Sequence, residues 1–285
     1  MIASMTRRSL LRGSAILAAS AATRGTSFAF APHPTNSDTI RLGIASYTFR
    51  KFDRAHLIDF MHQLKTPYLN LKDVHLPMTP LDQVKGIADE YRAAGFILTA
   101  AGNITFNKDD DADIRQKFEY VKTAGIPIMV CAPTRQVLPR MEKFVKEYNI
   151  KMAIHNHGPE DKNFPSPFDV LDAVKNMDER VGLCIDVGHA TRAGADVPKA
   201  IHAAGPRLHD LHVKDLADGK VKESQVAVGD GVLPFPQIFR ALQEINYPGC
   251  VDLEYEINAD DPMPGVIKSF AYMRGVIAGM GLKSA

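Results

Sequence analysis

The sequence predicts an α/β protein of the closed (β/α)8 class, a TIM barrel, built as a single domain after an N-terminal export signal. From residue 40 onward, short apolar strand-like stretches alternate with segments of helical period, and eight such strands in about 250 residues match this class. The later strands also carry ionisable residues on one face and apolar residues on the other. An open doubly wound sheet is the alternative, but no G-x-G-x-x-G turn follows the first strand.

Short apolar runs predict the strands, and segments with helical periodicity predict the helices. The barrel domain is expected over residues 40–282, and Gly95, Gly125 and Gly205 stand where helices would end. The predicted strands cover about residues 41–46, 68–74, 96–101, 126–132, 151–156, 182–187, 208–213 and 250–255. The predicted helices cover residues 55–64, 81–94, 112–124, 136–148, 166–176, 197–204 and 235–245.

The first 31 residues have the features of a secretory signal. Thr6–Arg12 is basic, Gly13–Ala22 is short and rich in small and apolar residues, and Ala29–Ala31 offers a small-x-small cleavage site. The paired arginines followed by Ser-Leu-Leu are similar to a twin-arginine export signal, which implies a periplasmic location. A retained amphipathic helix is the alternative. No stretch reaches the ~20 apolar residues of a membrane span, so no membrane association is expected after cleavage.

The composition excludes two kinds of partner. Lys and Arg total 34 against 33 Asp and Glu, a formal charge of +1, so no basic footprint for nucleic acid or an anionic membrane is present. The three cysteines, Cys131, Cys184 and Cys250, all fall in predicted strands. We expect them to be buried apolar residues rather than disulfide partners.

Four predicted strands end in polar residues on a single face. In the stretch Gly182–His189, Leu183 and Ile185 share one face, while Cys184 and Asp186 share the other. An unpaired buried carboxylate costs several kcal/mol, and a metal ion would remove that cost. Three further stretches place ionisable side chains on the same inward face, namely His155 and His157, then Asp210, His212 and Lys214, then Asp252, Glu254 and Glu256.

Imidazole and carboxylate groups at strand ends are ligands for first-row metals. Together they suit Mn²⁺, Zn²⁺, Fe²⁺ or Co²⁺ better than Ca²⁺. The candidate ligands are far apart in the sequence, so no local spacing predicts the site. The prediction depends on strand parity, the alternation that places every second side chain of a strand on the same face.

The motifs HNHG, CIDVGHA, LHVKD and VDLEYE, in that order, resemble the xylose isomerase-like TIM-barrel superfamily over about residues 40–280. This group contains sugar epimerases and isomerases, inosose dehydratases and endonuclease IV. The segment LKDVHLP at Leu71–Pro77 resembles exported proteins called sugar phosphate isomerase/epimerase. The resemblance implies one divalent metal ion (Mn, Zn, Mg, Co or Fe) held by His155, Asp186, His212 and Glu254. The epimerases generally have glutamate where this chain has His155.

The resemblance also implies roles in catalysis. Glu254, His157 or His189 could remove the proton next to a carbonyl, and Lys214 or His75 could act as general acid. The expected function is a metal-dependent isomerase or epimerase acting through an enediolate on a keto-sugar. A lyase or dehydratase acting by β-elimination on a keto-sugar or 3-keto-glycoside, and a non-catalytic exported sugar-binding protein, are the alternatives. Lys72, His75 and Glu256 are expected to bind the small carbohydrate substrate, and a homo-oligomer is left open.

Overall fold

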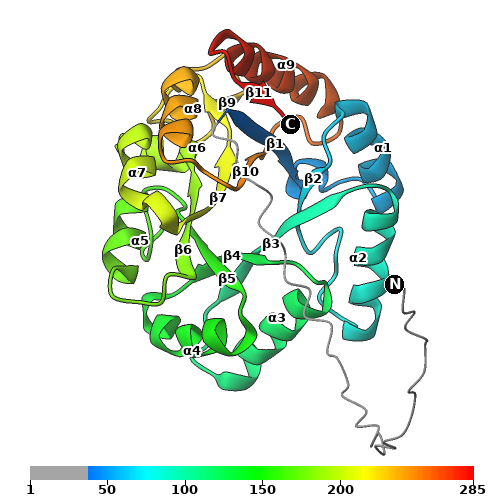
Figure 1. Cartoon of the computed structure of the whole chain (residues 1–285), viewed down its shortest axis with the longest axis vertical. Coiled ribbons are helices and arrows are strands. Elements are labelled where there is room, and N and C mark those ends of the chain that lie inside the picture. The colour runs from blue at the N-terminus through cyan, green and yellow to red at the C-terminus, as the bar shows by residue number, and fades with distance from the viewer. Residues whose placement is uncertain (1–37) are drawn as a thin grey trace, which may run out of the picture. The chain divides into compact units, whose positions relative to one another are not determined.

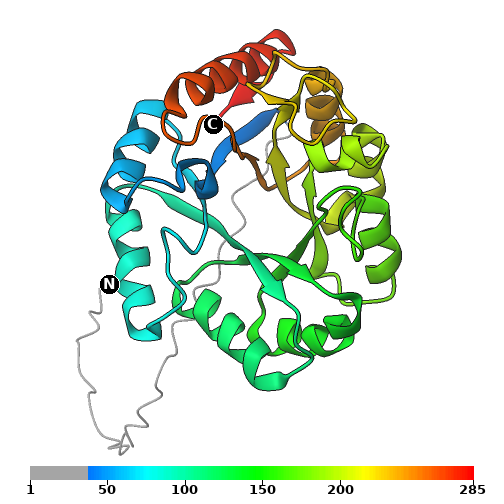
Figure 2. The same cartoon turned by 180° about the vertical axis from the view of Figure 1, so that it is seen from behind.

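A computed structural model describes residues 38–285, and within them eight parallel strands form a closed barrel surrounded by helices (Figure 1). The reverse view in Figure 2 shows the same ring of helices outside the strands. The predicted signal over residues 1–31 lies outside the described residues. Among the described helices, none is long and apolar enough to cross a membrane.

The parallel pairing closes the sheet. β1 pairs with β2 on one side and with β10 on the other, with Ile44 opposite Leu253, so an open doubly wound sheet is excluded. The short β8 and β9 form a separate antiparallel ribbon after β7, and β11 pairs with β1. The strands are β1 (Thr39–Ala45), β2 (Tyr68–Leu71), β3 (Ile97–Phe106), β4 (Ile128–Pro133), β5 (Lys151–His155), β6 (Val181–Asp186), β7 (Leu208–Val213), β8 (Asp215–Leu216), β9 (Gln225–Val226), β10 (Cys250–Leu253) and β11 (Lys283–Ser284).

The helices begin at polar caps where the sequence supplies them. Asp53 and Asp110 accept hydrogen bonds from the first turns of α1 and α3, and Ser166 forms a capping box with Asp169 at the start of α5. The helices are α1 (Arg54–Leu64), α2 (Leu81–Ala93), α3 (Asp111–Thr123), α4 (Leu138–Tyr148), α5 (Pro167–Val174), α6 (Val187–Arg192), α7 (Val197–Ala204), α8 (Phe235–Glu244) and α9 (Met263–Gly279), with short 3-10 turns η1 (Ser46–Phe49), η2 (Arg135–Val137) and η3 (Gly205–Arg207).

Two helices were not predicted. α9 covers the barrel next to α1 and α8, and its sequence mixes apolar and polar residues without a clear stripe. α6 begins directly after β6, because the Asp186 side chain accepts a hydrogen bond from the His189 amide and caps the helix. Val187 therefore starts a helix and is not the last residue of the strand.

Small side chains fill the middle of the barrel. Ala100, Val130, Ala153 and Cys184, one each from β3 to β6, pack together apart from the larger core between strands and helices. Cys184 thus points inward as its strand parity predicts, and all three cysteines are free and buried as expected. The polar residues at the carboxyl ends of the strands lie above this apolar layer.

Candidate functional site

Four side chains from four strand ends meet at one end of the barrel. The side chains of His155, Asp186, His212 and Glu254, from β5, β6, β7 and the end of β10, each offer one ligand atom, and these atoms all lie within 4.8 Å of one another. They are the residues that the sequence resemblance implied as metal ligands. We call them the ligand quartet.

The spacing within the quartet fits a metal ion. Nε2 of His155 lies 3.2 Å from Nδ1 of His212 and 3.6 Å from Oδ2 of Asp186, and Nδ1 of His212 lies 3.4 Å from Oε2 of Glu254. Atoms bound tetrahedrally at the usual Zn–N and Zn–O distances would be about 3.3–3.6 Å apart. Oδ2 of Asp186 is buried and has no hydrogen-bond partner. The quartet can therefore hold a divalent metal ion.

Lys214 links the carboxylates of the site. Its side chain is only 4% exposed, and its Nζ lies 3.2 Å from Asp186 Oδ2, 3.1 Å from Glu254 Oε2 and 2.5 Å from Glu256 Oε2. The contact with Asp186 is an ion pair without hydrogen-bond geometry. Fully ionised, three carboxylates and one ammonium carry a net charge of −2, which a divalent cation would cancel.

These contacts shift the ionisation of the site. Burial opposes the charge of Lys214, but Asp186 and Glu254 outweigh it and hold the Lys214 pKa well above its ordinary value. Burial likewise opposes the charge of Glu254, yet Lys214 and His212 hold the Glu254 pKa well below its ordinary value. Burial raises the pKa of Glu256, although Lys214 acts against it. Lys214 is thus a fixed ammonium that stabilises negative charge more readily than it releases a proton.

His155 is neutral in this setting. Burial, reinforced by His157 and His212, lowers the His155 pKa well below its ordinary value. A neutral imidazole has the free lone pair that a metal ligand needs.

A polar layer below the quartet orients His212. Asn70 Nδ2 lies 2.9 Å from Asp210 Oδ2 and 3.1 Å from His212 Nε2, on the ring side away from the quartet. Asp252 is fully buried beside Asp210, and burial together with Asp210 raises its pKa well above the ordinary value. An added Cβ at Gly43 would lie 2.0 Å from Asp252 Oδ1, so only glycine leaves room for this carboxyl group. The inward direction predicted for Asp210 is confirmed.

His157 and His189 lie against the quartet. The His157 ring is 4.3 Å from the His155 ring, with Nε2 2.8 Å from Asn103 Nδ2 and Nδ1 3.4 Å from Asp161. The His189 ring centroid is 5.9 Å from that of His155, and burial lowers the His189 pKa. Both predicted catalytic histidines are therefore brought to the site.

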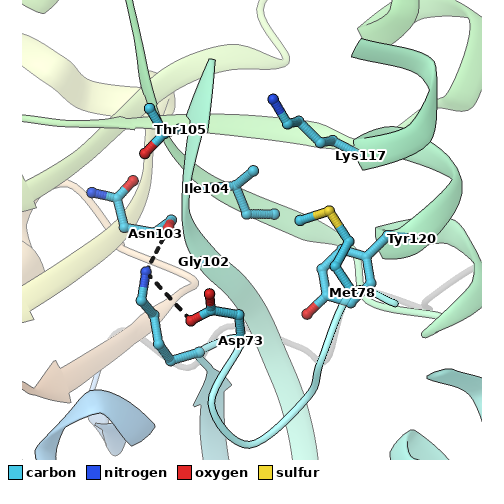
Figure 3. A pocket seen from close by; sticks show the side chains of 9 residues that line it. Asp73, Met78, Gly102, Asn103, Ile104, Thr105, Lys117 and Tyr120 are labelled. Atoms are coloured by element: carbon cyan, nitrogen blue, oxygen red, sulfur yellow. Dashed lines mark hydrogen bonds and ion pairs between the residues drawn. The ribbon is translucent and has the colours of Figure 1, made fainter. Parts of the chain in front are cut away.

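Lys72 lies in a neighbouring pocket of about 260 Å³ between β3, α3 and the loop after β2 (Figure 3). Its Nζ donates a hydrogen bond of 2.7 Å to the Asn103 carbonyl, and the Asn103 side chain contacts His157. One residue therefore separates Lys72 from the histidines of the site. The pocket is lined by Lys72, Asp73, Met78, Gly102, Asn103, Ile104, Thr105, Lys117 and Tyr120.

His75 is placed elsewhere. It is fully buried, its Nε2 lies 3.1 Å from the Phe52 carbonyl, and burial lowers its pKa. β2 ends at Leu71, and four residues later the buried His75 contacts the carbonyl of Phe52 and not the quartet. The predicted substrate contact and general-acid role of His75 find no support in this position.

Three polar residues of the site were missed at the sequence level. Asn70 lies in β2, two residues before Lys72, and the period-2 alternation that puts the two on one face could have revealed it. Asn103 lies within β3, where its register with β4 shifts, and carries no charge to mark it. Arg192 is three residues after His189 on α6, so it could be connected with His189 only if that helix was predicted.

Comparisons with known proteins agree with this geometry. The sequence model of the family described as xylose isomerase-like TIM barrel matches residues 11–276. An inosose dehydratase of Mesomycoplasma hyopneumoniae (strain 7448) is 25% identical over 162 residues, covering 50% of this chain and 53% of that protein. The chain thus aligns with about half the length of the curated relatives it matches.

Solved structures share the fold. The IolI protein with a bound zinc atom superposes with a TM-score of 0.69 at 18% identity, covering 84% of this chain and 99% of that one. The 3-keto-D-glucoside 4-epimerase YcjR of E. coli superposes with a TM-score of 0.65 at 16% identity, covering 83% and 99%. With the family match spanning most of the sequence, the closed barrel and the four-strand ligand quartet lead to one conclusion: this chain belongs to the xylose isomerase-like TIM barrel family.

Proposed function

We propose that this protein is a divalent-metal-dependent enzyme that removes the proton next to the carbonyl of a keto-sugar, and that it isomerises or epimerises its substrate. The observation that carries the proposal is the ligand quartet with Lys214 beside it, at the end of the barrel where the catalytic residues of this fold are found. Related proteins that act on carbohydrates, an inosose dehydratase and a 3-keto-D-glucoside 4-epimerase, support the substrate class.

A bound divalent ion would polarise the substrate carbonyl and favour the negative charge that develops on its oxygen. Asp186, His155 and His212 would hold the ion, with Glu254 as the fourth ligand. Lys214, a buried ammonium, lies where it can stabilise the same negative charge. Glu254 and His157 are the candidates for the base, since both side chains lie at the site and both are of types that act as general bases.

Elimination is the second candidate, and one observation favours it. His155 stands where the epimerases generally have glutamate, so Glu254 is the only glutamate among the four ligands. A two-base epimerisation places bases on both faces of the carbon, whereas β-elimination needs one base and one acid. The similarity to an inosose dehydratase over half of each chain is consistent with this alternative.

The test is metal analysis of the purified protein, followed by NMR of keto-sugars in D2O. Deuterium at the carbon next to the carbonyl, dependent on metal, is the expected result. Recovery of an isomeric sugar would identify an isomerase or epimerase, and an unsaturated product a dehydratase. A protein that binds sugars without metal and without exchange would refute the proposal and indicate a non-catalytic binding protein.

A further inference from the structure

Arg192 is a buried arginine that contacts His189, one of the histidines of the site. Its side chain is 4% exposed, its carboxylate partner is Glu160, and its guanidinium NH1 lies 3.2 Å from Nδ1 of His189. Glu160 belongs to the loop between β5 and α5, so the arginine joins that loop to helix α6.

The chemistry of this contact fixes the proton on His189. A guanidinium has only N–H donors and keeps its charge in proteins, so the nitrogen that it contacts must accept with a lone pair. Nδ1 of His189 is therefore unprotonated, and the single ring proton of the neutral imidazole is on Nε2. We infer that Arg192 is a positioning residue that sets His189 as a hydrogen-bond donor, through Nε2–H, to an oxygen of the substrate.

The surrounding backbone holds the pair in this arrangement. The His189 amide donates a 2.7 Å hydrogen bond to Asp186, which fixes the start of α6 relative to the quartet. Gly158 passes over the contact at φ +84, and an added Cβ would lie 3.0 Å from Arg192 NH1 and 3.4 Å from His189 Nδ1. A side chain at residue 158 would therefore crowd the pair, and its backbone conformation is one that glycine favours.

The inference rests on the proposed function for the substrate contact, but the proton position does not depend on it. A histidine with its only lone pair engaged by Arg192 cannot take a proton at the site. This is why His189, one of the three candidates for the base at the sequence level, is left out in favour of Glu254 and His157. Its neutral donor can instead stabilise a developing oxyanion, as preorganised donors do in other enzymes.

The proton position is tested by NMR of protein labelled with ¹⁵N in its histidines, with His189→Gln to assign the signals. At neutral pH we expect Nδ1 of His189 to have the shift of an unprotonated nitrogen and Nε2 that of a protonated one. Arg192→Met should mix the two tautomers. Arg135→Met is the control, because Arg135 is 44% exposed and pairs only loosely with Asp169 at 3.5 Å. A protonated Nδ1 in the wild type, or an unchanged tautomer in Arg192→Met, would overturn the inference.

Kinetics separate a donor from a base. The amide N–H of glutamine reaches about as far as Nε2–H, so His189→Gln should keep kcat within about tenfold of the wild type. His189→Ala should lose about 10²-fold, the usual effect of removing one oxyanion donor. Arg192→Lys should recover part of the kcat lost in Arg192→Met, with KM little changed. If His189→Gln is as inactive as His189→Ala, His189 is not a donor. If no variant and no wild type shows solvent exchange, the proposed function fails, while the NMR result still decides the proton position.

Discussion

Replacing Lys214 by methionine tests whether its ammonium group offsets the negative charge of the carboxylates at the site. Methionine keeps much of the apolar stem and removes the ammonium, which leaves the buried carboxylate of Asp186 and its neighbours Glu254 and Glu256 without a cation. Removing one partner of a buried ion pair typically costs about 3–5 kcal/mol. We expect a loss of this size in the free energy of unfolding when the protein is measured in the presence of a chelator.

Added metal should reverse much of this loss. An ion that binds only the folded state stabilises it by about 2.7 kcal/mol at a hundredfold excess over Kd. In Lys214→Met the ion meets one more uncompensated negative charge, so its stabilising effect should exceed that in the wild type. Urea unfolding with chelator and then with Mn²⁺ or Zn²⁺ measures both quantities.

The matched control is Lys268→Met. Lys268 also pairs with a carboxylate, Asp230, at 2.5 Å, but the two side chains are 59% and 42% exposed. Such a surface pair contributes about 0–1 kcal/mol. If Lys214→Met loses no more stability than this control in chelator, or if metal stabilises it no more than the wild type, then Lys214 does not balance the quartet and the charge argument is wrong.

Three further predictions concern other parts of the chain. His155→Ala should lose bound metal by elemental analysis while the fold survives, whereas His155→Glu should bind hard divalent ions more tightly; unchanged metal content in both would remove His155 from the ligands. Burial lowers the pKa of His209 to about 4, so this residue stabilises the fold above its unfolded pKa of about 6.5 and loses that contribution as pH falls toward about 4. Between about pH 7 and pH 5 the wild type should lose about 2 kcal/mol more unfolding free energy than His209→Gln, and parallel curves would contradict this. Finally, we propose that the protein is exported with removal of about residues 1–31, and an intact mass that includes Met1 would refute it.

Strand parity predicted that the quartet residues share the inward face, and the family resemblance singled out the four ligands. A period-2 pattern states which side chains share a face, and in a parallel barrel the carboxyl ends of all strands meet at one mouth. His155, Asp186, His212 and Glu254 could therefore be placed together although no local motif joins them. Parity holds only within a strand, however. It could not foresee that the chain turns after Leu71 and buries His75 in the core.

Helices without a clear apolar stripe escaped prediction for a related reason. α9 has buried residues at Val266, Phe270, Met273 and Ile277, but apolar residues such as Ile267 and Tyr272 lie on its exposed side and blur the pattern. α6 is only six residues long and starts at Val187, directly after β6 ends at Asp186. The positions of His189 and Arg192 follow from that helix, so their contact could not be read from strand parity.

The two halves of the barrel mouth differ in what they supply. β5, β6, β7 and β10 provide the quartet, and Lys214 and Glu256 follow two of these strands. β2 and β3 provide amides, namely Asn70 below the quartet and Asn103 beside His157, and the pocket with Lys72 lies on their side. The quartet comes from four strands that are neighbours in the barrel. A sugar held at the quartet would extend toward β3, where the side-chain amide of Asn103 matches a hydroxyl group. Substitutions at Asn103 should accordingly change the choice of sugar more than the affinity for metal, because Asn103 contacts His157 and no ligand of the quartet.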